Sequence, residues 1–288
     1  MSQARVLALT LLALLAFAGN SLLCRMALRE TRIDPASFTT LRLVSGALAL
    51  WLIVRMRGAA ASSAGNAYSA FALFAYAICF SLAYVQLSAG TGALLLFGAV
   101  QATMIGWGLY GGERLRALQL GGLLLAAAGL IGLLLPGLSA PPLAAATLML
   151  AAGAAWGVYS LRGRASNATP LSTTARNFAL SVPFAFAALG VSGWSSALSL
   201  DGRGLAYALA SGIVTSALGY AVWYTALQGL SRTQAATVQL SVPIIAAFGG
   251  VLLLGEPVTW RLLLCAAAIL GGIALVIVAP ARTAVSTR

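Results

Sequence analysis

Ten apolar runs, each about as long as a membrane span, follow one another along this chain and restrict its fold more than any other feature. A transmembrane helix needs about 20 predominantly apolar residues. The gaps between the runs are short and contain the Gly, Pro and charged residues that are typical of turns. We therefore expect an all-α integral membrane protein with transmembrane helices near residues 6–26, 37–55, 68–87, 90–110, 117–135, 143–162, 172–191, 205–227, 234–254 and 260–278.

The first run has an alternative interpretation as a secretory signal peptide. Arg5 precedes it, and Ala16-Phe17-Ala18 resembles a cleavage site. However, the run continues to Leu23, beyond the usual length of a signal core. Its removal would also leave the first half of the chain one helix short of the second half. We therefore interpret it as the first transmembrane helix.

The composition agrees with lipid as the main solvent and excludes several classes of protein. Apolar residues make up 61% of the chain and charged residues 8%, whereas soluble domains carry about 25% charged residues. The net charge is +12, but the Arg residues occur singly or in pairs between the apolar runs, so we exclude nucleic acid as a partner. The chain has no His and no Lys, and its five acids are scattered. We expect no enzyme activity, no metal site and no cofactor.

An internal repeat divides the chain into two halves. A shift of 143 positions aligns Gly112-Glu113 with Gly255-Glu256, and each pair directly follows a predicted span. Each half contains five spans, so the second half must enter the membrane from the opposite side. Such inverted repeats are typical of secondary transporters. We predict one five-helix repeat in residues 1–138 and its inverted counterpart in residues 139–288, with a central cavity between them, so that a monomer is sufficient for function.

The distribution of Arg predicts the orientation in the membrane. Ten Arg residues lie on the side that holds both termini, namely Arg5, Arg55, Arg57, Arg114, Arg116, Arg162, Arg164, Arg232, Arg282 and Arg288. Five lie on the other side, namely Arg25, Arg29, Arg32, Arg203 and Arg261. Basic loops are enriched on the cytoplasmic side of membrane proteins. Both termini are therefore expected in the cytoplasm.

The segment Thr40-Leu41-Arg42-Leu43-Val44-Ser45-Gly46-Ala47, together with the Gly-Glu pairs that follow the fourth and ninth spans, resembles the drug/metabolite transporter superfamily in its ten-helix EamA form. This resemblance implies a central cavity lined by spans one to four and six to nine, with spans five and ten outside it. Within the family, the chain resembles bacterial exporters of aromatic amino acids and related compounds. The chain departs from the family pattern at one position. The first half has Val100 where the second half has Pro243, a proline that is often seen in this family, so we expect the two gates to be built differently.

Neutral polar and aromatic residues inside the spans are the candidate substrate-binding residues. A lipid-facing amide is costly, so the amides inside the spans should face the protein interior. Aromatic residues recur at four-residue spacing in the third span and cluster in the eighth, which places them on shared helix faces. The predicted site is Asn20, Tyr76, Phe80, Tyr84, Gln101, Trp107, Trp156, Tyr159, Tyr220, Trp223, Tyr224 and Gln239. Helix-to-helix packing is the structural alternative for each of them.

Two Arg residues, Arg42 and Arg176, each lie a few residues inside a span. The default expectation is that their side chains extend to the membrane surface. The alternative is a structural role or a contact with a substrate carboxylate.

These features together predict a secondary transporter that exports small organic solutes by alternating access, with aromatic or bulky neutral amino acids as substrates. Proton-driven transporters place acids within the membrane. All five acids here lie in loops or at span edges, which favours facilitated diffusion. The alternatives are a permease for a nucleotide sugar or a cationic drug, or a membrane scaffold that transports nothing. The expected location is the bacterial inner membrane, with the lipid bilayer and a small-molecule substrate as partners.

Overall fold

The structure is a computed structural model that describes residues 1–58, 65–112, 115–137, 140–164, 169–195, 198–230 and 232–278. These residues fold into helices, and no strand occurs among them. The helices are α1 (Gln3–Glu30), α2 (Pro35–Met56), α3 (Ala67–Tyr84), α4 (Ala89–Tyr110), α5 (Ala117–Leu134), α6 (Leu143–Arg164), α7 (Pro170–Ser195), α8 (Gly202–Ala210), the π-helix η1 (Ser211–Leu218), α9 (Gly219–Ala226), the 3-10 helix η2 (Leu227–Gly229), α10 (Arg232–Gln239), α11 (Ser241–Leu254) and α12 (Trp260–Val278).

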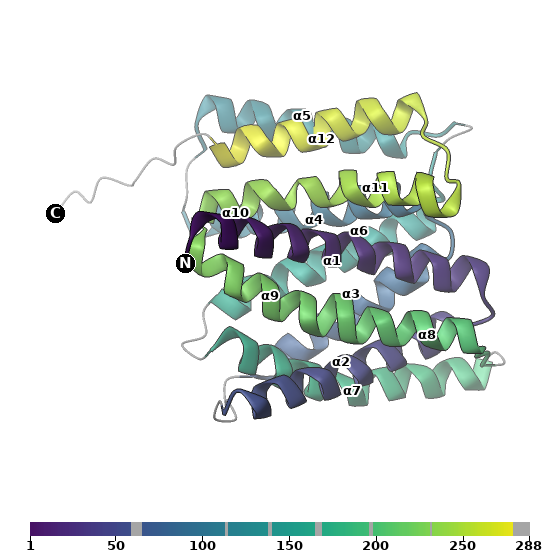
Figure 1. Ribbon diagram of the computed structural model, residues 1–288. Coiled ribbons are helices and arrows are strands. Elements are labelled where there is room, and N and C mark those ends of the chain that lie inside the picture. Colours follow the sequence, from purple (N-terminus) through teal and green to yellow (C-terminus); the bar gives the residue numbers. More distant parts are fainter. Residues whose placement is uncertain are drawn as a thin grey trace.

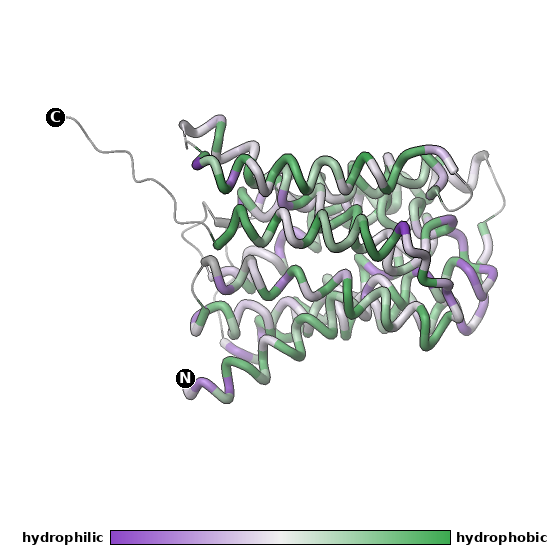
Figure 2. The backbone as a smooth tube through the Cα atoms, turned by 90° about the horizontal axis from the view of Figure 1, so that it is seen from above, coloured by the Kyte–Doolittle hydropathy of each residue, from purple (hydrophilic) through white to green (hydrophobic). Residues whose placement is uncertain are grey.

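Ten helices in the described ranges are long and apolar enough to cross a membrane. They coincide with the ten predicted spans, so the predicted all-helical membrane fold is confirmed. The eighth span is the continuous helical segment from α8 to η2, and the ninth consists of α10 and α11. Hydrophobic residues predominate along these spans, and hydrophilic residues are more frequent towards the helix ends (Figure 2).

The predicted turns end the helices for recognisable local reasons. At Asp34-Pro35, the Asp34 side chain accepts hydrogen bonds from the backbone N–H groups of Ala36 and Ser37 at 3.0 and 2.9 Å, and proline occupies the first turn of α2. The Gly-Glu pairs begin with glycines of positive φ, 89° at Gly112 and 60° at Gly255. Glycine adopts this left-handed conformation without steric cost and so terminates a helix. Glu113 and Arg114 lie outside the described residues.

Most of the spans form one bundle, and two lie outside it. Helices α5 and α12 pack against each other along one edge of the molecule, and α2 and α7 pack together at the opposite edge (Figure 1). Helix α6 packs between α3 and α4, while α1 contacts η1, α9 and α11. The outer position of α5 and α12 agrees with the family resemblance.

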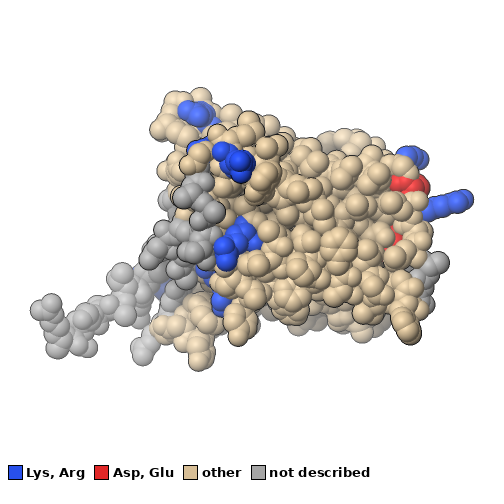
Figure 3. Space-filling view, turned by 90° about the horizontal axis from the view of Figure 1, so that it is seen from below, with Lys and Arg blue, Asp and Glu red and all other residues tan. Residues whose placement is uncertain are grey.

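Charged side chains gather at the two ends of the bundle and leave an uncharged band between them on the face shown in Figure 3. The chain begins at one end and, after ten crossings, α12 finishes at the same end (Figure 1). We refer to the end of the bundle where the chain begins and α12 finishes as the terminal end, and to the opposite end as the far end.

The fourth and ninth spans differ in the continuity of their helices. Helix α4 runs without interruption through Val100, whereas the ninth span breaks at Leu240 between α10 and α11. Pro243 has no backbone N–H, so it cannot donate to the carbonyl of Gln239 four residues earlier, where the break occurs. Gln239, the last residue of α10 before this break, lines an internal cavity.

Candidate functional site

A cavity of about 360 Å³ lies inside the bundle. Its wall contains mid-span residues such as Asn20 and Phe80, and it also contains Pro170, the exposed first residue of α7 at the terminal end. The cavity therefore extends from the middle of the membrane to the surface at that end. Ten of the twelve predicted site residues line it, namely Asn20, Tyr76, Phe80, Gln101, Trp156, Tyr159, Tyr220, Trp223, Tyr224 and Gln239. Their role in binding a substrate remains a prediction.

Aromatic rings from three different helices form a connected wall. The Trp156 ring of α6 lies 4.9 Å from the Tyr76 ring of α3 and 5.4 Å from the Tyr220 ring of α9, measured between centroids. Trp156 and Tyr220 are stacked with an interplanar angle of 24°. Phe80 continues this wall beyond Tyr76 at 5.3 Å. Trp156 thus bridges the aromatic clusters that the sequence places on the third and eighth spans, and the result is a surface suited to flat solutes.

Two predicted site residues lie away from the cavity. The Tyr84 ring is fully buried, but it packs against α4, where a Cβ added at Gly92 would come within 2.4 Å of the ring. Its hydroxyl donates to the carbonyl of Ala89, so Tyr84 fills the α3–α4 contact. Trp107 is 61% exposed on the outer surface of α4 and pairs with Tyr110. This position is typical of the aromatic belt at a membrane surface.

A buried polar network adjoins the aromatic wall at mid-span. The Asn20 side-chain amide donates to the Tyr76 hydroxyl at 3.2 Å, and its carbonyl accepts from the hydroxyls of Ser211 and Thr215 at 2.8 and 3.2 Å. Ser211 and Thr215 belong to the π-helix η1, a rare local structure that recurs at functional sites. The sequence does not reveal this π-helix, and Thr215 was not among the predicted site residues.

Arg42 belongs to the same network, and the default expectation for it is wrong. Its side chain is 1% exposed and points into the protein instead of extending to the membrane surface. The guanidinium donates to the Ser216 hydroxyl at 3.3 Å and to the Tyr76 hydroxyl at 3.1 Å. Close approach of α2 and η1 allows this, because a Cβ at Gly212 would lie 2.5 Å from the Arg42 carbonyl oxygen. Arg176, by contrast, is exposed and donates to the carbonyl of Gly65.

Several lining residues were missed by the sequence interpretation. Some are apolar side chains without a distinguishing pattern, namely Phe17, Leu96, Phe97, Val100 and Met104, and others are small hydroxyl residues, namely Thr173, Thr174, Thr215 and Ser216. The adjacent threonines at 173 and 174 were a detectable sign, since they interrupt an apolar span. Helix α2 contributes no lining residue, so the second span does not line the cavity as the family resemblance implies. Its Arg42 side chain lies behind the wall, in contact with Tyr76 and Phe80.

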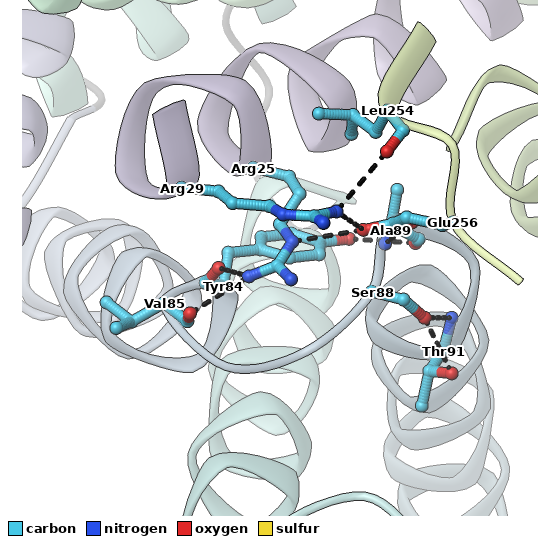
Figure 4. Close-up of polar contacts among 9 residues, drawn as sticks. All are labelled: Arg25, Arg29, Tyr84, Val85, Ser88, Ala89, Thr91, Leu254 and Glu256. Carbon is cyan, nitrogen blue, oxygen red and sulfur yellow. Dashed lines mark hydrogen bonds and ion pairs between the residues drawn. The ribbon is translucent and has the colours of Figure 1, made fainter. Parts of the chain in front are cut away.

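The far end of the bundle is held by an ion-pair cluster (Figure 4). Arg25 of α1 lies 3.0 Å from the carboxylate of Glu256, which follows α11, and Arg29 lies 3.9 Å from the same carboxylate. The second carboxylate oxygen accepts from the backbone N–H of Ala89 at 2.8 Å. Arg25 also donates to the carbonyls of Tyr84 and Val85. The cluster therefore connects α1, the α3–α4 connection and the end of α11.

Glu256 is 6% exposed and Arg25 11% exposed, so this pair is largely shielded from water. All three ion pairs of the described residues lie at the far end, the third joining Arg203 to Glu30. The cavity and the ion pairs occupy opposite ends of the bundle, since the cavity reaches the surface at the terminal end.

Comparison with known proteins gives one family match. Residues 143–278 match the model of the EamA-like transporter family. A relative from Pseudomonas aeruginosa, described as an uncharacterised protein, is 58% identical over 278 residues, which is 96% of each chain. The second half of the chain is thus similar to the EamA-like transporter family. A solved crystal structure of a protein, 18% identical in sequence, superposes on this chain with a TM-score of 0.66 over 95% of this chain and 96% of the other, which shows a shared fold. The family match suggests a membrane transporter of small solutes.

Proposed function

We propose that this EamA-like protein is a secondary transporter of flat or bulky neutral solutes, with aromatic amino acids as the leading class. The observation that carries the proposal is the wall formed by Tyr76, Trp156 and Tyr220 inside a cavity of about 360 Å³. Small-molecule sites have volumes of roughly 300–1,000 Å³, with apolar walls and a few polar groups. The resemblance to the bacterial exporter YddG points to the same class of substrate.

The cavity offers aromatic contacts for the apolar part of such a solute and hydrogen-bonding groups for its polar part. Aromatic contacts contribute about 0.5–1.5 kcal/mol beyond the burial of apolar area. The amides of Asn20, Gln101 and Gln239 line the same space and supply neutral hydrogen-bonding groups. A cationic drug is the less supported alternative, because no acid lines the cavity within the described part of the chain.

The proposed cycle is alternating access. A cavity that reaches the terminal end, together with an ion-pair cluster at the far end, corresponds to one state of such a cycle. The opposite state requires the Arg25–Glu256 pair to separate. We infer facilitated diffusion through a monomer in the bacterial inner membrane, with both termini in the cytoplasm, so that the solute gradient sets the direction of net export.

Uptake of labelled amino acids into proteoliposomes tests the proposal, with Trp156→Ala as the informative variant and Trp107→Ala as its matched control. Loss of the Trp156 ring should weaken the apparent affinity for L-phenylalanine by about two- to tenfold, the equivalent of one aromatic contact. Trp107 is on the outer surface, so its loss should leave the affinity unchanged. Equal affinities in both variants and the wild type, or no uptake of any amino acid by the wild type, would contradict the proposed site and substrate.

A further inference from the structure

The charge of Arg42 has no counter-ion in the described residues. The printed ion pairs involve Arg25, Arg29 and Arg203, and none involves Arg42. Its guanidinium makes hydrogen bonds through two nitrogens to neutral hydroxyls, while the third nitrogen, Nη1, is buried without a hydrogen-bond partner. The arginine side chain keeps its positive charge in proteins. A full charge is therefore buried at mid-span beside the cavity.

An uncompensated charge in this position destabilises the protein unless other interactions offset the loss of hydration. Removal of an ion from water costs several kcal/mol in real proteins, and ionisable groups within a membrane usually mark a functional site. The rings of Tyr76 and Phe80, whose centroids lie 5.2 and 5.3 Å from the guanidinium carbon, stabilise the cation in part. Both rings line the cavity, so the charge lies directly behind the wall that a solute would touch.

The Tyr76 hydroxyl lies between the Arg42 guanidinium and the cavity. Its oxygen accepts two hydrogen bonds, one from Nη2 of Arg42 at 3.1 Å and one from the amide nitrogen of Asn20 at 3.2 Å. Neither of these nitrogens can accept a hydrogen bond. The hydroxyl hydrogen must therefore point to a third group, and Tyr76 itself lines the cavity. A hydroxyl polarised by a neighbouring cation is a strong donor to an anionic oxygen.

We propose that Arg42 and Tyr76 form a receptor for a carboxylate of the transported solute. The carboxylate accepts the Tyr76 O–H and neutralises the Arg42 charge, while the apolar body of the solute lies against Trp156 and Tyr220. This inference rests on the proposed transport function and narrows it, because a solute without a carboxylate should bind poorly even if its ring fits. Arg42 does not line the cavity, so it acts as a positioning residue and Tyr76 as the contacting one.

Three related probes isolate the carboxylate. L-phenylalanine carries both charged groups, 3-phenylpropionate lacks the amine, and L-phenylalaninamide replaces the carboxylate by a neutral amide. Each probe is added to the purified full-length protein, and the shift of the thermal unfolding midpoint gives its apparent affinity. Competition against labelled L-phenylalanine in proteoliposomes repeats the comparison during transport. The two carboxylates should bind at least about tenfold more tightly than the amide, since hydrogen bonds to charged groups exceed neutral ones by this amount or more.

Variants assign the preference to specific residues. Arg42→Gln should reduce the ratio between 3-phenylpropionate and the amide to about one, and Arg42→Lys should restore part of it because it retains the charge. Tyr76→Phe keeps the ring but removes the hydroxyl and should also reduce the ratio, which provides a second test if Arg42→Gln does not fold. Arg176→Gln, which removes a span arginine outside the cavity wall, should leave the ratio as in the wild type.

The outcomes separate this inference from the proposed function. If the wild type transports L-phenylalanine but binds the amide as tightly as the carboxylates, the receptor is overturned and the transporter stands. If no amino acid is transported, yet 3-phenylpropionate stabilises the wild type and not Arg42→Gln, the carboxylate receptor is supported. The proposal that amino acids are the substrates is then wrong. If 3-phenylpropionate stabilises neither the wild type nor any variant, the receptor is overturned whatever the transport result.

Discussion

Asp34 connects two loops at the far end, and its charge should stabilise the fold. One carboxylate oxygen caps α2 through Ala36 and Ser37, and the other accepts from the backbone N–H of Ser199 at 3.0 Å. Burial raises the pKa of Asp34, but these hydrogen bonds outweigh it and hold the pKa below the ordinary value. Because the folded-state pKa is lowered, the stabilisation is complete above the ordinary value of about 3.9 and is lost as the pH falls through the lowered pKa.

Comparison with Asp34→Asn isolates this charge, since asparagine also caps helices well. At about pH 6 the wild type should be more stable than Asp34→Asn by about 1 kcal/mol, the worth of one hydrogen bond. The difference should shrink towards zero as the pH falls through the lowered pKa of Asp34 and the carboxylate becomes protonated. Thermal unfolding of the two proteins in detergent at several pH values measures the stability difference and its dependence on pH. A difference that is constant with pH would show that the charge of Asp34 contributes nothing.

At the scale of elements, the Arg25–Glu256 pair should control how readily the far end opens. Removing one partner of a shielded ion pair leaves the other charge unpaired, which disfavours the closed arrangement. Cys24 is a native reporter: it is fully buried and lies four residues beyond Asn20, hence on the same face of α1 and one turn closer to the far end. Glu256→Gln should increase the rate of maleimide labelling of Cys24 by about tenfold, the effect of about 1.4 kcal/mol.

The labelling is measured in a background in which Cys79 and Cys265 are replaced by alanine, so that Cys24 is the single thiol. Glu30→Gln is the matched control, because Glu30 pairs with Arg203 at the same end at 3.7 Å, where both side chains are more exposed. Exposed pairs contribute little, so this variant should label at the wild-type rate. Equal acceleration by both variants would mean that the Arg25–Glu256 pair has no special part in closure.

At the scale of the whole molecule, the position of the acids predicts how transport is driven. Glu30, Asp34, Asp201 and Glu256 all lie at helix ends or in connections at the far end, and none of them lines the cavity. A proton relay across the membrane needs ionisable groups along the path. We therefore expect proteoliposomes to take up labelled L-phenylalanine down its own gradient, with initial rates that change little on addition of a proton ionophore.

An imposed pH gradient is the counter-test. Rates measured with the gradient in either direction should equal those measured without it, whereas strict dependence on the gradient would reveal a proton pathway through other groups. Protein-free liposomes provide the leak rate, and Trp156→Ala shows that the uptake passes through the cavity.

The sequence by itself determined the number and limits of the spans, because a helix in lipid satisfies its own backbone hydrogen bonds and needs only an apolar run of sufficient length. These requirements are local. The same holds for the breaks, where Asp34-Pro35 and Gly255 act through their immediate neighbours. Ten of the predicted site residues also line the cavity, because buried amides and mid-span aromatics have few other favourable places in a membrane.

The tertiary structure alone decided which side chain meets which. Tyr76 and Tyr84 share one stripe of α3, yet Tyr76 reaches the cavity while Tyr84 packs against Gly92. Arg42 is buried because Tyr76, Phe80 and Ser216 surround its guanidinium, and these residues come from segments distant in the sequence. Hydrophobicity along the chain determines whether a helix enters the membrane. The face that each helix turns inward follows from packing between helices, which depends on small residues and partners that no local pattern reveals.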